Sequence, residues 1–323
     1  MIITRTPFRI SFAGGGSDLK SFYENYGGAV LSTSINKYIY LSSHDFFEKN
    51  KSLIKYSKTE LISNNDEIVH PIIREVFKYF KINQIDFNST ADIPSGTGMG
   101  SSSSFTVGLI NLCCEIKNKF MSKQEIADLA CHVEIELLKE PIGKQDQYAA
   151  SFGGLNFIEF NKDLTVSIEK INLPIETKRT LNNNLILFYT GIKRSAKDVL
   201  AKQKKNIEEN KKIKNLINMV DLAYDLKDEL KLGNVDSLGE ILHEGWMNKR
   251  ELSSNISNNQ IDELYNIGIE SGASGGKLLG AGAGGFILFY CKEKYHNKLR
   301  SKLKKLDEFD FKMEESGTQT IFK

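Results

Sequence analysis

The sequence has little cysteine, little proline and almost no excess of charge of one sign. Its 323 residues include four cysteines, too few to cross-link so long a chain, and none of them form the Cys-x-x-Cys spacing of a redox or metal site. Five prolines leave little room for a proline-rich linker. A formal net charge of +2 disfavours a general affinity for nucleic acid. We therefore expect a cytoplasmic protein with reduced cysteines and no nucleic-acid partner.

Long apolar runs and a targeting segment are also lacking. The longest uncharged run, residues 93–114, is rich in Gly, Ser and Thr and is not typical of a membrane span. Residues 1–5 lack the basic and apolar regions of a signal peptide. We therefore expect no membrane partner. The length predicts two domains or one large domain.

The spacing of apolar residues predicts strands followed by helices in both halves of the chain. This pattern is typical of an α+β protein with two domains, which we expect at residues 1–175 and 176–323. The expected strands are residues 2–12, 29–41, 85–93, 185–189 and 286–291. The expected helices are residues 19–26, 68–80, 105–119 and 195–214, and helical patterns continue to about residue 271. Ser17 or Asp18 is expected to cap the first of these helices. A further helix is expected to begin at the capping box of residues 122–125 and to end at Pro141. Strand-like pieces and polar loops are expected at residues 162–184.

The strongest local signal is residues 94–104, which read Pro-Ser-Gly-Thr-Gly-Met-Gly-Ser-Ser-Ser-Ser. Alternating glycines allow the backbone to approach a ligand closely, and a helix that starts at the serines offers unpaired N–H groups to a polyphosphate. The Gly-Lys-Ser/Thr of a Walker A loop is missing, and Ser103 stands where a dinucleotide fingerprint needs its third glycine. The alternative is a flexible linker between a strand and a helix.

Two further glycine-rich segments are weaker signals. Residues 280–285 fit Gly-x-Gly-x-x-Gly, but a strand follows where a Rossmann fold has a helix, so a tight turn between strands is an equal interpretation. Residues 14–18, beside Arg9, also fit a plain turn between strand and helix.

Two carboxylates complete the candidates. Glu134 and Asp146 can hold Mg²⁺ and accept a proton, as phosphoryl transfer requires. A solvated helix Glu and a loop Asp are the alternative.

The five histidines lack metal-ligand spacing, so zinc is not expected. The basic residues 202–214 are interpreted as a solvated helix face, and Trp246 as packing.

The order of the motifs in residues 6–14, 94–102 and 277–285 resembles that of the GHMP kinases, which phosphorylate small molecules. Within that family, residues 8–19 and 189–196 are most similar to D-glycero-D-manno-heptose 7-phosphate kinases and to the kinase part of fucokinases. The lack of an added nucleotidyl-transfer domain favours the former. Galactokinases have Gly-Glu-His where this chain has residues 14–16, all glycine, which favours a longer or phosphorylated sugar over galactose.

The resemblance implies an N-terminal ribosomal-protein-S5-like domain, a C-terminal ferredoxin-like α/β sandwich and an active site in the cleft between them. It also implies that the protein uses ATP and Mg²⁺ to phosphorylate the anomeric hydroxyl of D-glycero-D-manno-heptose 7-phosphate. The product would be the 1,7-bisphosphate, an intermediate in the synthesis of nucleotide-activated heptose for surface polysaccharide. The alternatives are another sugar 1-kinase, such as a fucokinase or a uronic-acid kinase, a non-catalytic sensor that binds ATP and sugar, and a nucleic-acid-binding domain. Arg9, Glu134 and Asp146 argue against the sensor. The oligomeric state, a homodimer included, stays open.

The resemblance further implies a role for each matched residue. Asp146 accepts the proton and Arg9 stabilises the developing charge, while Ser102 and Glu134 bind Mg²⁺. The ATP phosphates are held by Gly96, Gly98, Met99, Gly100, Ser101, Ser102 and Ser103. The sugar lies against Gly15, Gly16, Ser17 and Asp18, and its phosphate against Lys144, Lys193 and Arg194. The cleft is supported by Lys277, Gly280, Gly282, Gly284 and Gly285.

Overall fold

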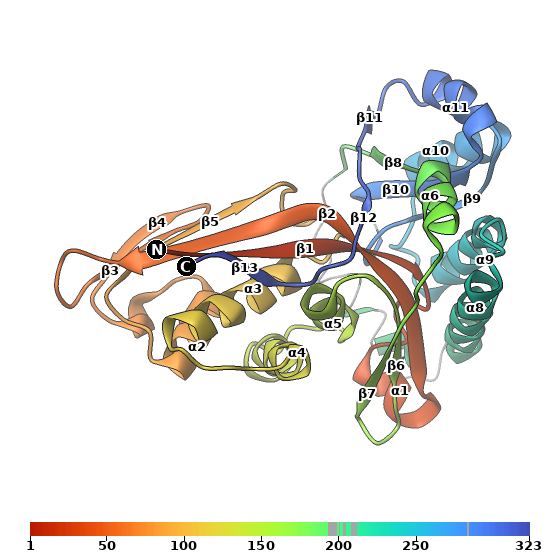
Figure 1. Cartoon of the computed structure of the whole chain (residues 1–323). Helices are drawn as coiled ribbons and strands as arrows, with labels where there is room; N and C mark the ends of the chain where they lie inside the picture. The colour runs from red at the N-terminus through yellow and green to blue at the C-terminus, as the bar shows by residue number, and fades with distance from the viewer. Residues whose placement is uncertain (193–198, 200, 203–204, 208–211, 283) are drawn as a thin grey trace.

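The computed structural model describes the whole chain except residues 193–198, 200, 203–204, 208–211 and 283. The described strands form two sheets (Figure 1). The large sheet contains β1 (Ile2–Ala13), β2 (Gly28–Asp45), β3 (Ser52–Lys55), β4 (Thr59–Ile62), β5 (Ile85–Ala91), β6 (Leu155–Phe160), β7 (Val166–Lys170), β12 (Met313–Glu314) and β13 (Gln319–Phe322). The small sheet has the order β11 (Asp307–Glu308), β8 (Leu185–Tyr189), β10 (Phe286–Cys291) and β9 (Ala273–Leu278).

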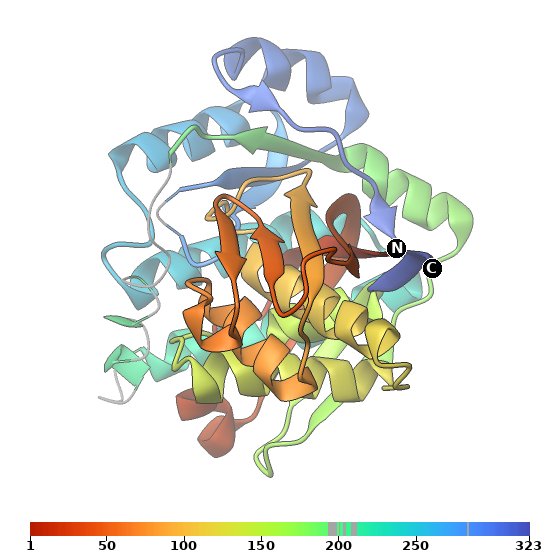
Figure 2. The ribbon, with the colours of Figure 1, turned by 90° about the vertical axis from the view of Figure 1, so that its left-hand side faces the viewer.

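Helices of the first half of the chain pack on the large sheet, and α8 (Ile213–Leu232) of the second half also packs on its strands β1 and β2 (Figures 1 and 2). The helices that accompany the large sheet are α1 (Lys20–Tyr26), η1 (Asn65–Glu67), α2 (Pro71–Phe80), α3 (Ser101–Ile116), α4 (Lys123–Cys131), the π-helix η2 (His132–Leu137) and α5 (Gln145–Phe152). Those that follow in the second half are α6 (Ile175–Asn184), α8 (Ile213–Leu232), α9 (Ser237–Leu252), α10 (Asn259–Glu270), η3 (Glu293–Tyr295) and α11 (His296–Lys302).

The long strand β2 organises the large sheet. Its first half pairs with β6, its second half pairs with β5, and β1 runs antiparallel along most of its length. Apolar residues of β1 such as Phe8, Ile10 and Phe12 are at most 1% exposed. Because α3 packs on β1 and β2, the loop that precedes α3 is held at the end of this buried layer.

The two halves of the chain share their cores. Leu222 and Leu226 of α8 belong to the same apolar cluster as β1 and β2. Phe22 of α1 in turn packs in the cluster that contains Trp246 of α9, whose side chain is 0% exposed. The expected role of Trp246 in packing is thus confirmed, and the large shared interface fixes one half against the other.

The structure confirms the α+β class and the five predicted strands, and it corrects four details. Residues 175–184, expected as part of a region of strands and loops, form the helix α6. The helix that begins at the Ser122 capping box changes to a π-helix after Cys131. Neither Ser17 nor Asp18 caps α1, because the Ser17 hydroxyl donates to the Gly14 and Ala29 carbonyls instead. The helix expected at 195–214 falls largely outside the described residues.

The fourth correction concerns the end of the chain. The expected division at residues 175 and 176 assigns the C-terminus to the second domain, and the division itself stays a prediction. In the structure, however, β12 pairs with β2 and β13 pairs with β1, so residues 313–322 return to the large sheet (Figure 1). Both chain termini therefore lie side by side on the large sheet. No helix in the described ranges has the length and apolar character needed to cross a membrane.

Candidate active site

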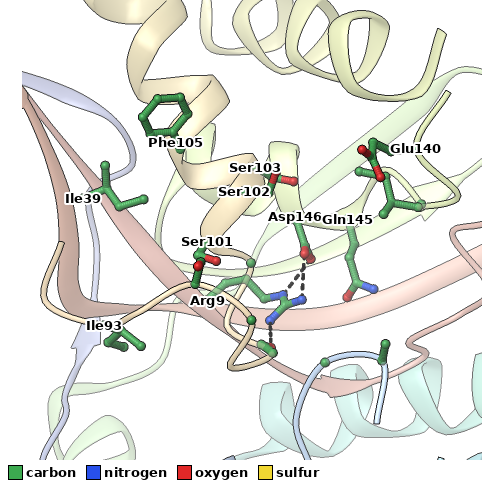
Figure 3. A pocket seen from close by; sticks show the side chains of 18 of the residues that line it. Arg9, Ile39, Ile93, Ser101, Ser102, Ser103, Phe105, Glu140, Gln145 and Asp146 are labelled. Carbon is green, nitrogen blue, oxygen red and sulfur yellow. Dashed lines mark hydrogen bonds and ion pairs between the residues drawn. The ribbon is translucent and has the colours of Figure 1, made fainter. Parts of the chain in front are cut away.

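We call the part of the chain that forms the large sheet the first unit and the part that forms the small sheet, with α8 to α10, the second unit. A cavity of about 900 Å³ is lined by residues of both units, including most of the matched residues. Its volume is in the range of small-molecule sites. Ser101, Ser102 and Ser103, at the start of α3, lie in the middle of the cavity wall in Figure 3, with Ile39, Ile93 and Phe105 to one side and Gln145 and Glu140 to the other. The cavity therefore has an apolar end and a polar end, separated by a helix N-terminus.

The apolar end includes three ring side chains. The ring of His70 lies 4.9 Å from that of Tyr56 and 5.1 Å from that of Phe105, measured between centroids. Burial lowers the pKa of His70, which favours the neutral imidazole. Uncharged rings beside aliphatic side chains make this end suitable for a flat heterocycle.

Arg9 joins the catalytic candidate Asp146 to the loop before α3. Its Nε and Nη2 atoms donate to the two Asp146 carboxylate oxygens at 2.7 and 2.8 Å, and Nη1 donates to the Gly98 carbonyl at 2.7 Å (Figure 3). The backbone N–H of Arg9 also donates to the Met99 carbonyl at 3.2 Å. This bidentate pair fixes a carboxylate close to the start of α3.

Glu134 is entirely buried on the π-helix η2, so it is not the solvated side chain of the alternative interpretation. Its Oε1 atom accepts from the Ser102 hydroxyl at 2.7 Å, and Oε2 accepts from the Gln147 side chain at 2.7 Å. Loss of solvent raises the pKa of Glu134. No cation pairs with this carboxylate among the residues that the structure describes.

Asp18 faces the polar end of the cavity from the turn after β1. Its carboxylate accepts from the backbone N–H groups of Gly16 and Gln145 at 3.1 and 3.2 Å and from the Gln145 side chain at 3.2 Å. Burial and, secondarily, the charge of Asp146 raise the pKa of Asp18. The two carboxylates therefore lie close enough to influence each other.

The glycines of residues 280–285 pack against the loop before α3. A Cβ atom on Gly280 would lie 2.4 Å from the Gly98 Cα atom, and one on Gly285 would lie 2.3 Å from the Thr97 carbonyl oxygen. Gly282 and Gly284 approach Ile256 and Ile192 in the same way. This segment thus contacts the loop directly through its backbone.

The remaining predicted site residues divide between the cavity wall and other places. Gly15, Gly16 and Gly100 line the cavity, whereas Ser17 and Met99 are buried and do not line it. The Lys144 ammonium donates to the Leu164 carbonyl and lies over the Tyr23 ring, away from the cavity lining, so the structure does not bring it to the substrate end as expected. Lys193 and Arg194, which carry the same expectation, lie outside the described residues.

A pair of glycine substitutions tests the packing of the loop. Gly96 and Gly98 both have positive φ, at 79° and 83°, so alanine imposes a backbone strain of about 1 kcal/mol at either position. A Cβ on Gly98 would also lie 2.6 Å from the Leu279 carbonyl oxygen, whereas nothing lies within 4 Å of one on Gly96. We expect Gly98→Ala to weaken binding of a fluorescent ATP analogue by about tenfold or more, and Gly96→Ala by clearly less. Equal effects of the two substitutions would contradict this packing.

Comparison with known proteins agrees with this arrangement. Residues 67–154 match the N-terminal domain of GHMP kinases, and residues 226–307 match their C-terminal domain. The chain is 32% identical, over 97% of both proteins, to a D-glycero-alpha-D-manno-heptose 7-phosphate kinase from Campylobacter jejuni. The chain belongs to the GHMP kinase family. The resemblance suggested by the three motifs is confirmed.

Two more relatives of this GHMP kinase extend the comparison. A bifunctional fucokinase/GDP-fucose pyrophosphorylase from Arabidopsis thaliana is 28% identical over 95% of this chain and 31% of that protein. A crystal structure described as a D-glycero-D-manno-heptose 1-phosphate kinase from Bacteroides thetaiotaomicron superposes with a TM-score of 0.82 over 100% of this chain and 99% of that one, at 22% identity. This structural likeness establishes the fold that the resemblance implied.

Sequence reasoning missed several residues in the cavity of this GHMP kinase. Lys249 lines the polar end, and Tyr56 and His70 line the apolar end. For Lys249 a signal was present, because it follows Trp246 by three residues and so shares the buried face of α9. The rings of Tyr56 and His70 come from loops whose positions depend on tertiary packing, so no local pattern identifies them.

Proposed function

We propose that this chain transfers the γ-phosphoryl group of ATP to the anomeric hydroxyl of a phosphorylated sugar of the D-glycero-D-manno-heptose 7-phosphate class. At the coarser level, the chain is an ATP-dependent sugar kinase of the GHMP family. The observation that carries the proposal is the side chain of Arg9, which donates to both oxygens of Asp146 and to the Gly98 carbonyl of the loop before α3. The product is a sugar 1,7-bisphosphate, and the cytoplasm, which holds ATP, is the proposed compartment.

The nucleotide binds from the apolar end of the cavity to its centre. Its base lies among the rings of Tyr56, His70 and Phe105, where it is removed from water. Its phosphates lie along residues 96–103, where backbone N–H groups and the positive end of the α3 dipole face negative charge. The contact between residues 280–285 and this loop keeps the loop in its binding conformation.

Ser102 and Glu134 suit Mg²⁺ as the ion that accompanies ATP. A hydroxyl and a carboxylate are oxygen ligands of the kind Mg²⁺ prefers, and the buried Glu134 carboxylate has no cationic partner in the described part of the chain. The described residues contain no group of three His, Cys, Asp or Glu side chains placed to bind a metal. Mg²⁺ commonly takes one or two protein ligands and fills its shell with phosphate and water, and it neutralises phosphate charge during transfer.

The chemical step is a displacement at the γ-phosphorus. The anomeric oxygen forms a bond to phosphorus, the bond to the ADP oxygen breaks, and the hydroxyl proton passes to the Asp146 carboxylate. Arg9 stabilises negative charge that develops beside the phosphate loop. Asp18 and Gln145 orient the sugar through their hydrogen-bonding groups at the polar end of the cavity.

A panel of acceptors tests this function. We expect kcat/KM to be about 100-fold higher for D-glycero-D-manno-heptose 7-phosphate than for the unphosphorylated heptose, fucose, galactose or glucuronic acid, because a charge-assisted contact to a phosphate contributes up to about 3 kcal/mol. The measurement is a coupled ADP-release assay, with NMR to identify the phosphorylated oxygen. A clear preference for fucose or a uronic acid would replace the proposed substrate, and transfer to a hydroxyl other than the anomeric one would contradict the proposed reaction.

A further inference from the structure

Two lysines at the polar end of the cavity have no role in the proposed chemical step, although Lys277 belongs to the motif expected to support the cleft. Lys249 of α9 and Lys277 of β9 both line the cavity, and they are only 6% and 3% exposed. The Lys277 ammonium donates to the Phe12 carbonyl at 2.9 Å, and the Lys249 ammonium donates to the Gly280 carbonyl. An ammonium group has three N–H donors, so donors remain for a ligand at both positions.

Neither lysine is paired with a carboxylate within the described ranges of the chain. Burial, and then neighbouring positive charges, lower the pKa of Lys249 to about 8 and that of Lys277 well below its ordinary value, while the charges of Asp18 and Asp146 partly offset this effect for Lys249. Buried charges are costly unless an opposite charge is near. The neighbours that act on the charge of Lys277 are positive, so an anionic ligand would stabilise its charged form.

The position of the two lysines indicates which anion they bind. Arg9 is already paired with Asp146, and the ATP phosphates have the loop of residues 96–103 and the N-terminus of α3. Lys277 contacts Phe12 at the end of β1, directly before the turn that carries Asp18. Both acids at this end, Asp18 and Asp146, repel a phosphate, so a phosphorylated sugar needs cations beside them.

We propose that Lys249 and Lys277 bind the phosphate monoester that the sugar substrate carries. This inference rests on the proposed function and assigns it a recognition site. It replaces Lys144, whose ammonium is directed to the Leu164 carbonyl, as the cation for this group. The two lysines thus determine specificity for phosphorylated over unphosphorylated sugars.

Substitution of each lysine by methionine tests the site, because methionine keeps most of the side-chain volume and removes the charge. We expect Lys249→Met and Lys277→Met each to raise KM for heptose 7-phosphate by about 10- to 100-fold, with little change in KM for ATP. We expect the rate with unphosphorylated heptose to fall clearly less than the rate with heptose 7-phosphate. Lys298→Met is the matched control, since Lys298 also donates to a backbone carbonyl, that of Glu270 at 2.8 Å, on the exposed surface.

Thermal unfolding separates a lost site from a lost fold. We expect heptose 7-phosphate to raise the midpoint of the wild type and of Lys249→Arg, which keeps the charge, but not that of Lys249→Met, while ATP shifts all three alike. A rise in KM for ATP, or an equal loss with both sugars, would assign the lysines to the nucleotide or to packing and overturn the inference. A wild type that phosphorylates no sugar phosphate would instead reject the proposed function itself.

Discussion

Asp146→Asn lowers kcat by about 10³-fold, within the range expected when a proton acceptor in the transition state is removed. The amide is nearly the same size as the carboxylate, but it has no negative charge and presents N–H groups to Arg9, which can only donate. Both the acceptor for the hydroxyl proton and half of the bidentate contact at 2.7 and 2.8 Å are lost. Steady-state kinetics with saturating ATP and sugar phosphate measures the change.

Binding of a fluorescent ATP analogue distinguishes chemistry from loop distortion in this variant, because the nucleotide should still bind. Glu308→Gln is the matched control. Arg300 donates to the two Glu308 oxygens in the same bidentate manner, at 2.7 and 2.8 Å, but on the surface of the second unit. We expect that control to retain full activity. Turnover of Asp146→Asn equal to that of the control would remove Asp146 from the mechanism.

Glu134→Gln lowers kcat/KM for ATP by about 100-fold, because the amide cannot supply the negative charge that holds Mg²⁺ beside Ser102. The new side chain keeps the contact with Ser102. Gln147 can rotate its amide so that its carbonyl oxygen, buried and without a hydrogen-bond partner, accepts from the new N–H₂ group. Titration of activity with Mg²⁺ measures the loss, which higher Mg²⁺ concentrations should partly restore.

The same substitution should not lower the stability of the protein without ligands. Because desolvation raises the folded-state pKa of Glu134, its contribution to stability is greatest below the unfolded-state pKa and is lost as pH rises through the folded-state value. At neutral pH the ionised carboxylate therefore costs folding free energy, which the neutral amide avoids. We expect an unchanged or higher unfolding midpoint and a smaller shift with Mg²⁺ and ATP.

The control for this substitution is Glu125→Gln. Glu125 also accepts a hydrogen bond from a serine hydroxyl, that of Ser122 at 2.8 Å, but in an exposed capping box. This control should keep normal activity and a normal Mg²⁺ dependence. If Glu134→Gln shows the Mg²⁺ dependence of the wild type, Glu134 serves packing and not metal binding.

The sequence by itself determined the local features of this protein. Alternating glycines before four serines predicted the loop and the start of a helix, and α3 does begin at Ser101. The Ser122 capping box marked the start of α4. These features depend on backbone geometry and on side chains a few residues apart, so a linear pattern records them. The order of three such motifs was enough to indicate the family.

The tertiary structure alone decided which distant residues meet. Glu134, which the sequence left open as a solvated helix residue, is buried against Ser102. Lys249 lines the cavity although it lies far from every motif. Lys144 is only two residues from Asp146 in the sequence, but its ammonium donates to the Leu164 carbonyl and it does not line the cavity. Burial and charge proximity arise from long-range packing of α9, β9 and β1, and no local spacing encodes them.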